Sequence, residues 1–234
     1  MKAEKLRYHA RQYVKAFVPA KVLQSRVHRR AFTQFAEKAG LVYFGYVDQH
    51  HDEHRLVRGF TVSATHKDNN YCIGSFKGYD VTVVERTDIL RFPGKPARPQ
   101  DWLIMTFDLH TPADLPHTFI GLHTHSETFY AELFTKFSHL AKTPMGTFMH
   151  LTPRFIHKYA VFTEPARLLQ AEHLFDAKTA ETIAETFGSL TIELTSDCLY
   201  LYAWHQRPTV SFLTNMLQNG LWLAKTIDER AADL

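Results

Sequence analysis

The sequence predicts an α+β fold: a mainly antiparallel β-sheet packed with helices, an N-terminal helical arm and a long C-terminal helix. After residue 40, short runs rich in β-branched and aromatic residues alternate with polar connectors, which are too short for parallel crossovers. Helical stretches precede and follow these runs without strict strand–helix alternation. We expect residues 1–38 to form a basic helical arm and residues 39–234 a single α+β domain.

The arm is predicted as two helices, over 4–18 and 21–38, because apolar residues recur at helical spacing in both and Pro19 lies between them. Gly40 is expected to end the second helix. The apolar stripe of the first helix consists of Leu6, Ala10, Tyr13 and Phe17. Its narrowness predicts that residues 1–18 are dispensable for folding.

The first half of the domain is predicted to be rich in strands, and Trp102 and its neighbours form the clearest core strand. The expected strands are 41–47, 55–64, 71–76, 80–85, 102–109 and 117–124. Three prolines in 92–100 predict a long loop.

The second half mixes both kinds of element. We expect helices over 126–141, 165–174 and 177–187, a strand over 157–163, a hairpin of 190–194 with 198–204, and a final helix over 208–228. The hairpin strand has two apolar faces, which is typical of a strand buried on both sides. Its aromatic face (Cys198, Tyr200, Tyr202, Trp204) is therefore expected in the core.

Two blocks of this pattern resemble a family of uncharacterised bacterial proteins. The first holds Gly40-Leu41-Val42-Tyr43-Phe44-Gly45, Leu56-Val57-Arg58-Gly59 and Gly78-Tyr79-Asp80-Val81-Thr82; the second runs from Tyr159-Ala160-Val161-Phe162 through Pro165-Ala166-Arg167-Leu168-Leu169 to the last helix. The resemblance covers roughly 38–228 and implies that relatives often carry membrane-spanning helices before this domain. Here the basic arm takes that place. The resemblance implies no activity.

Positive charge is concentrated at the N-terminus. Residues 1–30 hold nine Lys/Arg and one Glu, which gives 9 − 1 = +8, whereas the other 204 residues hold 18 Lys/Arg and 23 Asp/Glu, which gives −5. A basic arm on an acidic body is typical of a protein that meets phosphate on a membrane or a nucleic acid. The predicted surface-binding residues are Lys2, Lys5, Arg7, Arg11 and Lys15.

Composition and motifs limit the classes of function and the cellular locations that the sequence favours. The chain has only two cysteines, Cys72 and Cys198, and we recognise neither a signal peptide nor a membrane span. We therefore expect a cytoplasmic protein that associates peripherally with membranes, although one disulfide remains compatible with the sequence. Nucleophile elbows and glycine-rich phosphate loops are missing, so an enzyme is the less favoured class and no cofactor is expected.

The fifteen histidines raise the possibility of a metal site. On a strand, His123, His125 and Glu127 would share one face and offer two imidazoles and a carboxylate. The favoured interpretation is a capping box, with Thr124 as N-cap and Glu127 three residues later. A second cluster, 50–54, is interpreted as a solvated hairpin tip.

The leading functional hypothesis is a non-enzymatic interaction or membrane-peripheral domain whose arm contacts an anionic surface. The alternatives are a metal-dependent enzyme using His123, His125 and Glu127, and a nucleic-acid-binding protein. The acidic body disfavours nucleic acid, and a protein partner is also compatible with the arm.

Overall fold

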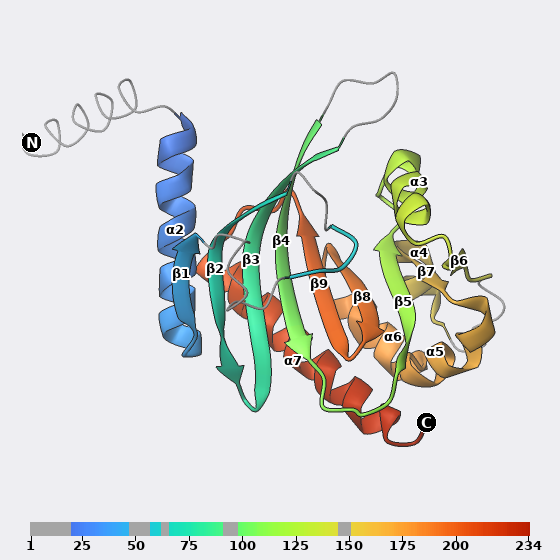
Figure 1. Ribbon diagram of the computed structural model, residues 1–234. Coiled ribbons are helices and arrows are strands. Elements are labelled where there is room, and N and C mark those ends of the chain that lie inside the picture. The colour runs from blue at the N-terminus through green and yellow to red at the C-terminus, as the bar shows by residue number, and fades with distance from the viewer. Residues whose placement is uncertain (1–19, 47–56, 62–65, 91–97, 145–150) are drawn as a thin grey trace, which may run out of the picture.

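An antiparallel sheet forms the centre of the fold (Figure 1). The computed structural model describes residues 20–46, 57–61, 66–90, 98–144 and 151–234. Within these residues the sheet has nine strands in the order β1-β2-β3-β4-β9-β8-β5-β7-β6. The strands are β1 (Val42–Tyr46), β2 (Lys67–Phe76), β3 (Tyr79–Leu90), β4 (Arg98–Asp108), β5 (Leu115–Leu122), β6 (Ala141–Lys142), β7 (Tyr159–Thr163), β8 (Leu190–Ser196) and β9 (Cys198–Trp204).

Helices precede the sheet, interrupt it and follow it. They are α2 (Ala20–Ala39), α3 (Glu127–Lys136), α4 (Pro153–Lys158), η1 (Pro165–Arg167, a 3-10 helix), α5 (Leu168–Leu174), α6 (Ala177–Thr186) and α7 (Val210–Ala231). The predicted α+β class, the antiparallel sheet and the long C-terminal helix are thus confirmed. None of these helices is long and apolar enough to cross a membrane, as far as the described residues go.

The sheet consists of two halves that meet at one pair of strands. Strands β1 to β4 form a meander, and β9, β8, β5, β7 and β6 form the second half. β4 pairs with β9 from Trp102 opposite Trp204 to Asp108 opposite Cys198. Ninety residues separate Asp108 from Cys198, so the sheet is continuous only because a late strand returns to an early one.

Helices α2, α4, α5, α6 and α7 contribute to the core on one face of the sheet (Figure 1). Leu103, Met105 and Phe107 of β4 point into this core, as do Leu199 and Leu201 of β9. The other face packs against α3 and the segment 57–61, and its core is mainly aromatic. Both faces of β9 are therefore buried, which confirms the prediction for its aromatic row, although Trp204 is only half-buried.

Helix α2 ends as the sequence predicts. Gly40 has φ +72°, a left-handed conformation that glycine adopts at low cost. The amide of Leu41 donates to the carbonyl of Ala36 at 2.9 Å, which is the long-range bond of a Schellman motif. Phe32 and Phe35 of this helix are buried in the core, so the core begins inside the range 1–38 that we assigned to the arm.

Several predicted elements of the first half differ. β2 begins at residue 67 instead of 71, and β3 covers 79–90 instead of 80–85. The described part of the predicted strand 55–64, residues 57–61, is a turn rather than a strand, because its polar groups bond to buried side chains instead of a neighbouring strand. The last three residues of the predicted loop 92–100 belong to a strand instead, because β4 begins at Arg98, which pairs with Leu90 of β3. Residues 91–97 lie outside the described part.

Boundaries further along the chain also differ. β5 ends at Leu122 instead of residue 124, and α3 ends at Lys136 instead of 141 because Ala141 pairs with Thr163 of β7. The predicted strand 157–163 starts only at Tyr159. Helix α4 occupies the residues before it, with Thr152 as N-cap and Pro153 in the first turn.

The predicted capping box at α3 is wrong. Ser126, and not Thr124, is the N-cap, and its hydroxyl accepts from the amide of Phe129 at 3.2 Å. Glu127 is consequently the first residue of the helix rather than the third. A carboxylate in the first turn still interacts favourably with the helix dipole.

Gly220 lets α7 approach the sheet closely. A Cβ atom at this position would lie 2.1 Å from Cε2 of Phe107 and 2.9 Å from Cδ1 of Leu201. Both contacts are shorter than van der Waals distance, so glycine is needed here for packing, although it weakens the helix itself.

We expect Gly220→Ala to destabilise the fold by about 1–3 kcal/mol, because the added methyl group overpacks the α7–β4 contact. The same change in an exposed helix usually stabilises by about 0.5–1 kcal/mol, so the sign is diagnostic. Urea unfolding measures the difference. Gln218→Ala, on the exposed side of α7, is the control and should change stability by less than about 0.5 kcal/mol. A stabilised Gly220→Ala protein would contradict the close approach.

The two candidate caps of α3 can be separated in the same way. Ser126→Ala should cost about 1 kcal/mol, because it removes the side-chain acceptor of the Phe129 amide, which then keeps only the backbone carbonyl of residue 126. Thr124→Ala removes the hydroxyl that the capping box would have used and should be nearly neutral. Equal losses in thermal unfolding would contradict the assignment of Ser126 as the cap.

Candidate functional site

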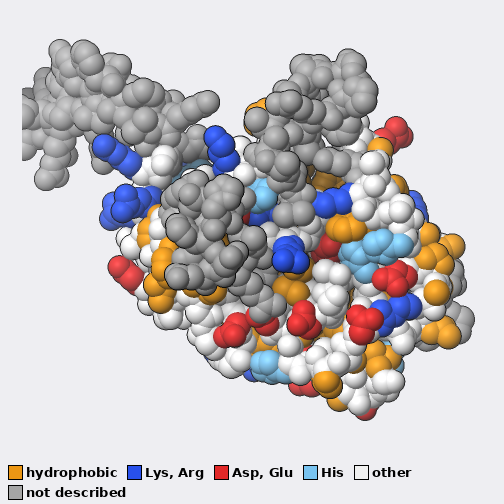
Figure 2. All heavy atoms as spheres, in the orientation of Figure 1, with side chains coloured by type: hydrophobic (Ala, Val, Ile, Leu, Met, Phe, Trp, Pro, Cys, Tyr) orange, Lys and Arg blue, Asp and Glu red, His pale blue; other side chains and the backbone are white. Residues whose placement is uncertain are grey.

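The exposed face of α2 is basic. Arg26, Arg29 and Arg30 are exposed, and Val27 between them is 44% exposed. In Figure 2, Lys and Arg side chains gather over the position of α2. The predicted surface-binding residues Lys2, Lys5, Arg7, Arg11 and Lys15 lie outside the described residues. The described part of the arm therefore contributes a short, positively charged surface with one apolar side chain in it.

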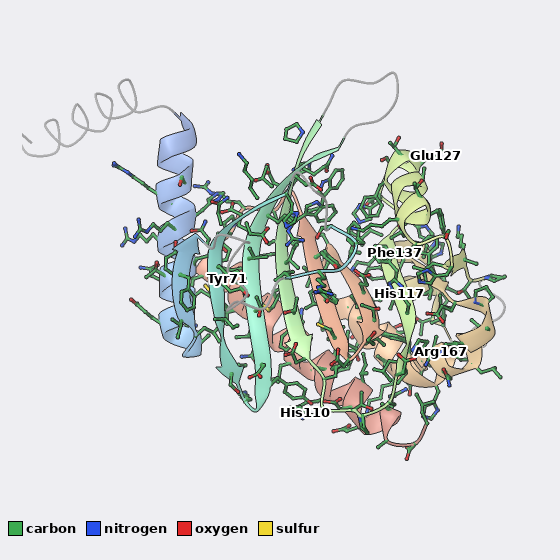
Figure 3. The ribbon with its side chains drawn as sticks, in the orientation of Figure 1. Tyr71, His110, His117, Glu127, Phe137 and Arg167 are labelled. Carbon is green, nitrogen blue, oxygen red and sulfur yellow. The ribbon has the colours of Figure 1, made fainter. Side chains whose placement is uncertain are left out.

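The candidate metal residues of the sequence lie in three different environments. His123 is exposed on a turn, with Nε2 3.0 Å from the carbonyl oxygen of Ile156. His125 is buried; its Nε2 lies 2.8 Å from Oγ1 of Thr191. Glu127 is exposed at the start of α3, where Figure 3 labels it. Because β5 ends at Leu122, the strand alternation that suggested a shared face does not apply.

Among the described residues, no group of three or more His, Cys, Asp or Glu side chains is arranged to hold a metal ion. The second histidine cluster, 50–54, lies outside them. Burial lowers the pKa of His125 to about 4, so its imidazole is a neutral part of the aromatic core at neutral pH. It stacks on Phe129 with a centroid distance of 4.1 Å.

The structure reveals a second polar feature that the sequence reasoning missed. Glu193 of β8 is fully buried, and its carboxylate accepts hydrogen bonds from three directions. Oε2 lies 2.5 Å from the hydroxyl of Tyr202 and 3.0 Å from the amide nitrogen of Phe60. Oε1 lies 2.8 Å from Nε2 of His117. Three donors compensate the loss of hydration that a buried carboxylate suffers.

His117 extends this set of hydrogen bonds toward the surface. Nδ1 of His117 lies 2.8 Å from Nε2 of His139, which is exposed. Burial and the negative charge of Glu193 raise the pKa of Tyr202 well above its ordinary value, so the phenol stays a donor. A carboxylate, two imidazoles and a phenol thus form one hydrogen-bonded chain between the interior and solvent.

Segment 57–61 lies over this chain and is fixed by side chains. Phe60 inserts its ring among Trp102, Phe119, Phe129 and Tyr202, with centroid distances of 4.5–5.4 Å. Nζ of Lys136 donates to the carbonyl of Phe60 at 2.6 Å. A Cβ atom at Gly59 would lie 1.9 Å from the hydroxyl of Tyr202, so only glycine fits there.

A buried ion pair holds the same segment from the other side. Arg86 of β3 is fully buried and donates from Nε and Nη2 to the two carboxylate oxygens of Asp68, at 2.7 Å each. Nη2 also donates to the carbonyl of Val57 at 2.7 Å, and Nη1 to Oγ1 of Thr61 at 3.1 Å. A paired guanidinium with additional acceptors is the arrangement that makes burial of both charges tolerable.

The sequence signal for the Glu193 chain is weak but present. Glu193 lies between Ile192 and Leu194, and this alternation predicts that its side chain faces solvent from a half-buried strand. What buries it is the segment 57–61, which the sequence analysis assigned to a strand. A charged residue in the middle of a short apolar strand was the one available hint.

Comparison with known proteins shows a similarity of fold. No family model and no curated protein matches this chain. The crystal structure of the mycobacterial trehalose monomycolate transport factor A has a similar fold, with a TM-score of 0.54 and 12% sequence identity. The similarity covers 87% of this chain and 94% of that chain. At this identity it shows a shared fold, and the resemblance to uncharacterised bacterial proteins stays a prediction.

The burial of His125 predicts a stability loss in mild acid. Its folded pKa of about 4 is below the unfolded value of about 6.5, so the unfolded chain binds the extra proton first. Stability should therefore fall as pH drops from about 6.5 to about 4, by about 2–3 kcal/mol from this residue. In urea titrations, His125→Gln should reduce this slope, whereas His123→Gln, its exposed neighbour, should keep it. Identical slopes in both variants would contradict the buried assignment.

Proposed function

We propose that this protein is a non-enzymatic, membrane-peripheral domain whose basic N-terminal segment contacts an anionic surface. The observation that carries the proposal is the charge distribution: +8 within residues 1–30 against −5 in the remaining 204. An arm of this kind is attracted to an anionic leaflet while an acidic body is held away from it. The domain would then sit at the surface with its arm toward the lipid.

The exposed face of α2 supports this orientation. Arg26, Arg29 and Arg30 extend the charge of residues 1–19 onto the folded domain, and Val27 adds apolar contact area among them. The helix does so without loosening the domain, because Phe32 and Phe35 on its other side are buried. The basic surface is therefore anchored to the core.

The structural neighbour is consistent with a role other than catalysis. It is named as a transport factor for trehalose monomycolate, and it shares the fold over most of both chains. A transport factor can act by binding and positioning rather than by chemistry. We propose a role of that kind, binding without chemistry, for this protein, and we place it at a membrane because of its own charge distribution.

Vesicle co-sedimentation tests the proposal with the full chain. Vesicles of phosphatidylcholine containing about one third phosphatidylserine should bind the protein at low salt, and pure phosphatidylcholine should not. Deleting residues 1–18 removes Lys2, Lys5, Arg7, Arg11 and Lys15 and should weaken binding more than about tenfold, since each surface charge contributes about 1 kcal/mol. Raising salt to about 1 M should mimic the deletion, because the Debye length falls to about 3 Å.

Charge-reversal variants test the orientation. Replacing Arg26, Arg29 and Arg30 with Glu should reduce vesicle binding strongly. The matched control replaces Lys178, Arg207 and Lys225, which are exposed on other elements, and changes the net charge equally. If both triple variants bind equally well, or if duplex DNA competes for the protein better than the vesicles do, the membrane proposal is wrong. Unfolding of the 1–18 deletion would assign the arm a structural role instead.

A further inference from the structure

A line of three titratable side chains connects the interior of the sheet to solvent. Glu193 on β8 is 0% exposed, His117 on β5 is 6% exposed, and His139 lies exposed between α3 and β6. The distances along the line are 2.8 Å from Oε1 of Glu193 to Nε2 of His117, and 2.8 Å from Nδ1 of His117 to Nε2 of His139. Both are ordinary hydrogen-bond lengths.

The carboxylate determines where the protons are. Glu193 can only accept, so Nε2 of His117 carries a hydrogen and, in the neutral ring, Nδ1 is a bare acceptor. His139 must then donate from Nε2 to that acceptor. The contact between the two imidazoles therefore requires that one of the two facing nitrogens stays unprotonated.

The groups around the pair can balance one positive charge. Oε1 of Glu164, after β7, accepts from the backbone amide of His117 at 3.3 Å, so a second carboxylate lies next to the backbone of this residue. Tyr202 from β9 remains a neutral donor to Glu193. The edge-to-face contact of Phe137 with His117, at 4.6 Å between centroids, excludes water from one side (Figure 3).

Two lysines, Lys136 and Lys142, lie three residues from His139, and the first of them is engaged elsewhere. Nζ of Lys136, at the end of α3, donates to the carbonyls of Gly59 and Phe60. It holds the segment 57–61, and through the amide of Phe60 that segment also reaches Glu193. One imidazolium next to Glu193 would form a buried charge-assisted pair, which is favourable. A second imidazolium would face the first across 2.8 Å, without an acceptor between them.

We propose that His117 and His139 form a pH-sensitive latch: the first proton taken up is kept within the pair, and the second breaks the imidazole–imidazole contact and releases the connection 137–140 from β5. The release follows from geometry: once both facing nitrogens carry a hydrogen, the 2.8 Å contact between the two rings has no acceptor left. Leu140 is buried and its amide donates to the carbonyl of Phe137, so the motion is confined to this connection and β6.

Amide hydrogen exchange, corrected for the intrinsic effect of pH, tests the latch on the full chain. Between pH about 7.5 and about 5, the range in which histidine changes charge, protection of residues 137–142 should fall by about tenfold. His125 also lowers global stability below about pH 6.5, because the unfolded chain takes up its proton there, but that loss acts on the whole domain and not on residues 137–142 alone. Segments of β4 and β9 serve as internal references and should stay protected.

A matched pair of variants distinguishes the latch from a global loss of stability at low pH. His139→Gln keeps an amide donor for Nδ1 of His117 and does not titrate, so its exchange at 137–142 should be independent of pH. His123→Gln removes another exposed histidine, on the turn after β5, and should respond like the wild type. Nitrogen-15 spectra of the imidazoles should show a protonated Nε2 in His117 at neutral pH. A flat wild-type profile, or a pH response in His139→Gln equal to that of the wild type, would overturn the proposal.

Discussion

The pairing of β4 with β9 is the constraint on which the rest of the structure depends. It joins a meander formed early in the chain to a second half whose strands come from residues 115–204. Both strands contribute large side chains to both faces, so a loss of this pairing would open two cores at once. Helix α7 stabilises the junction because Gly220 allows it to pack directly on Phe107 of β4 and Leu201 of β9.

The two faces of the sheet are stabilised by different physical means. Five helices bury apolar side chains on one face, where the hydrophobic effect is sufficient. On the other face, the segment 57–61 lacks strand pairing, and buried charged side chains replace it: Arg86 with Asp68 on one side, Glu193 with His117 on the other. This arrangement costs desolvation but fixes one geometry, since each charged group accepts or donates in defined directions.

The elements that could be predicted from sequence are those with strong local periodicity. Helix α7 and the β8–β9 hairpin lie close to their expected ranges, and Gly40 ends α2 as its conformational freedom suggested. The errors occur where tertiary contacts, and not the local sequence, determine the secondary structure. Residues 57–61 are rich in strand-forming types, yet Arg86 and Glu193 hold them as a turn, and α3 stops early because Ala141 pairs with β7. Glu193 and His117 lie 76 residues apart, and no local pattern joins them.

The two cysteines lie on either side of the β4–β9 junction, and both are buried. Cys72 on β2 belongs to one core and Cys198 on β9 to the other, three strand spacings away, which is roughly 14 Å and too far for a disulfide. Burial raises the pKa of Cys72 to about 12, so alkylating reagents find almost no thiolate there. Each half of the sheet thus contains a built-in probe of local opening. The rate at which either thiol is alkylated reports how often the strands around it separate.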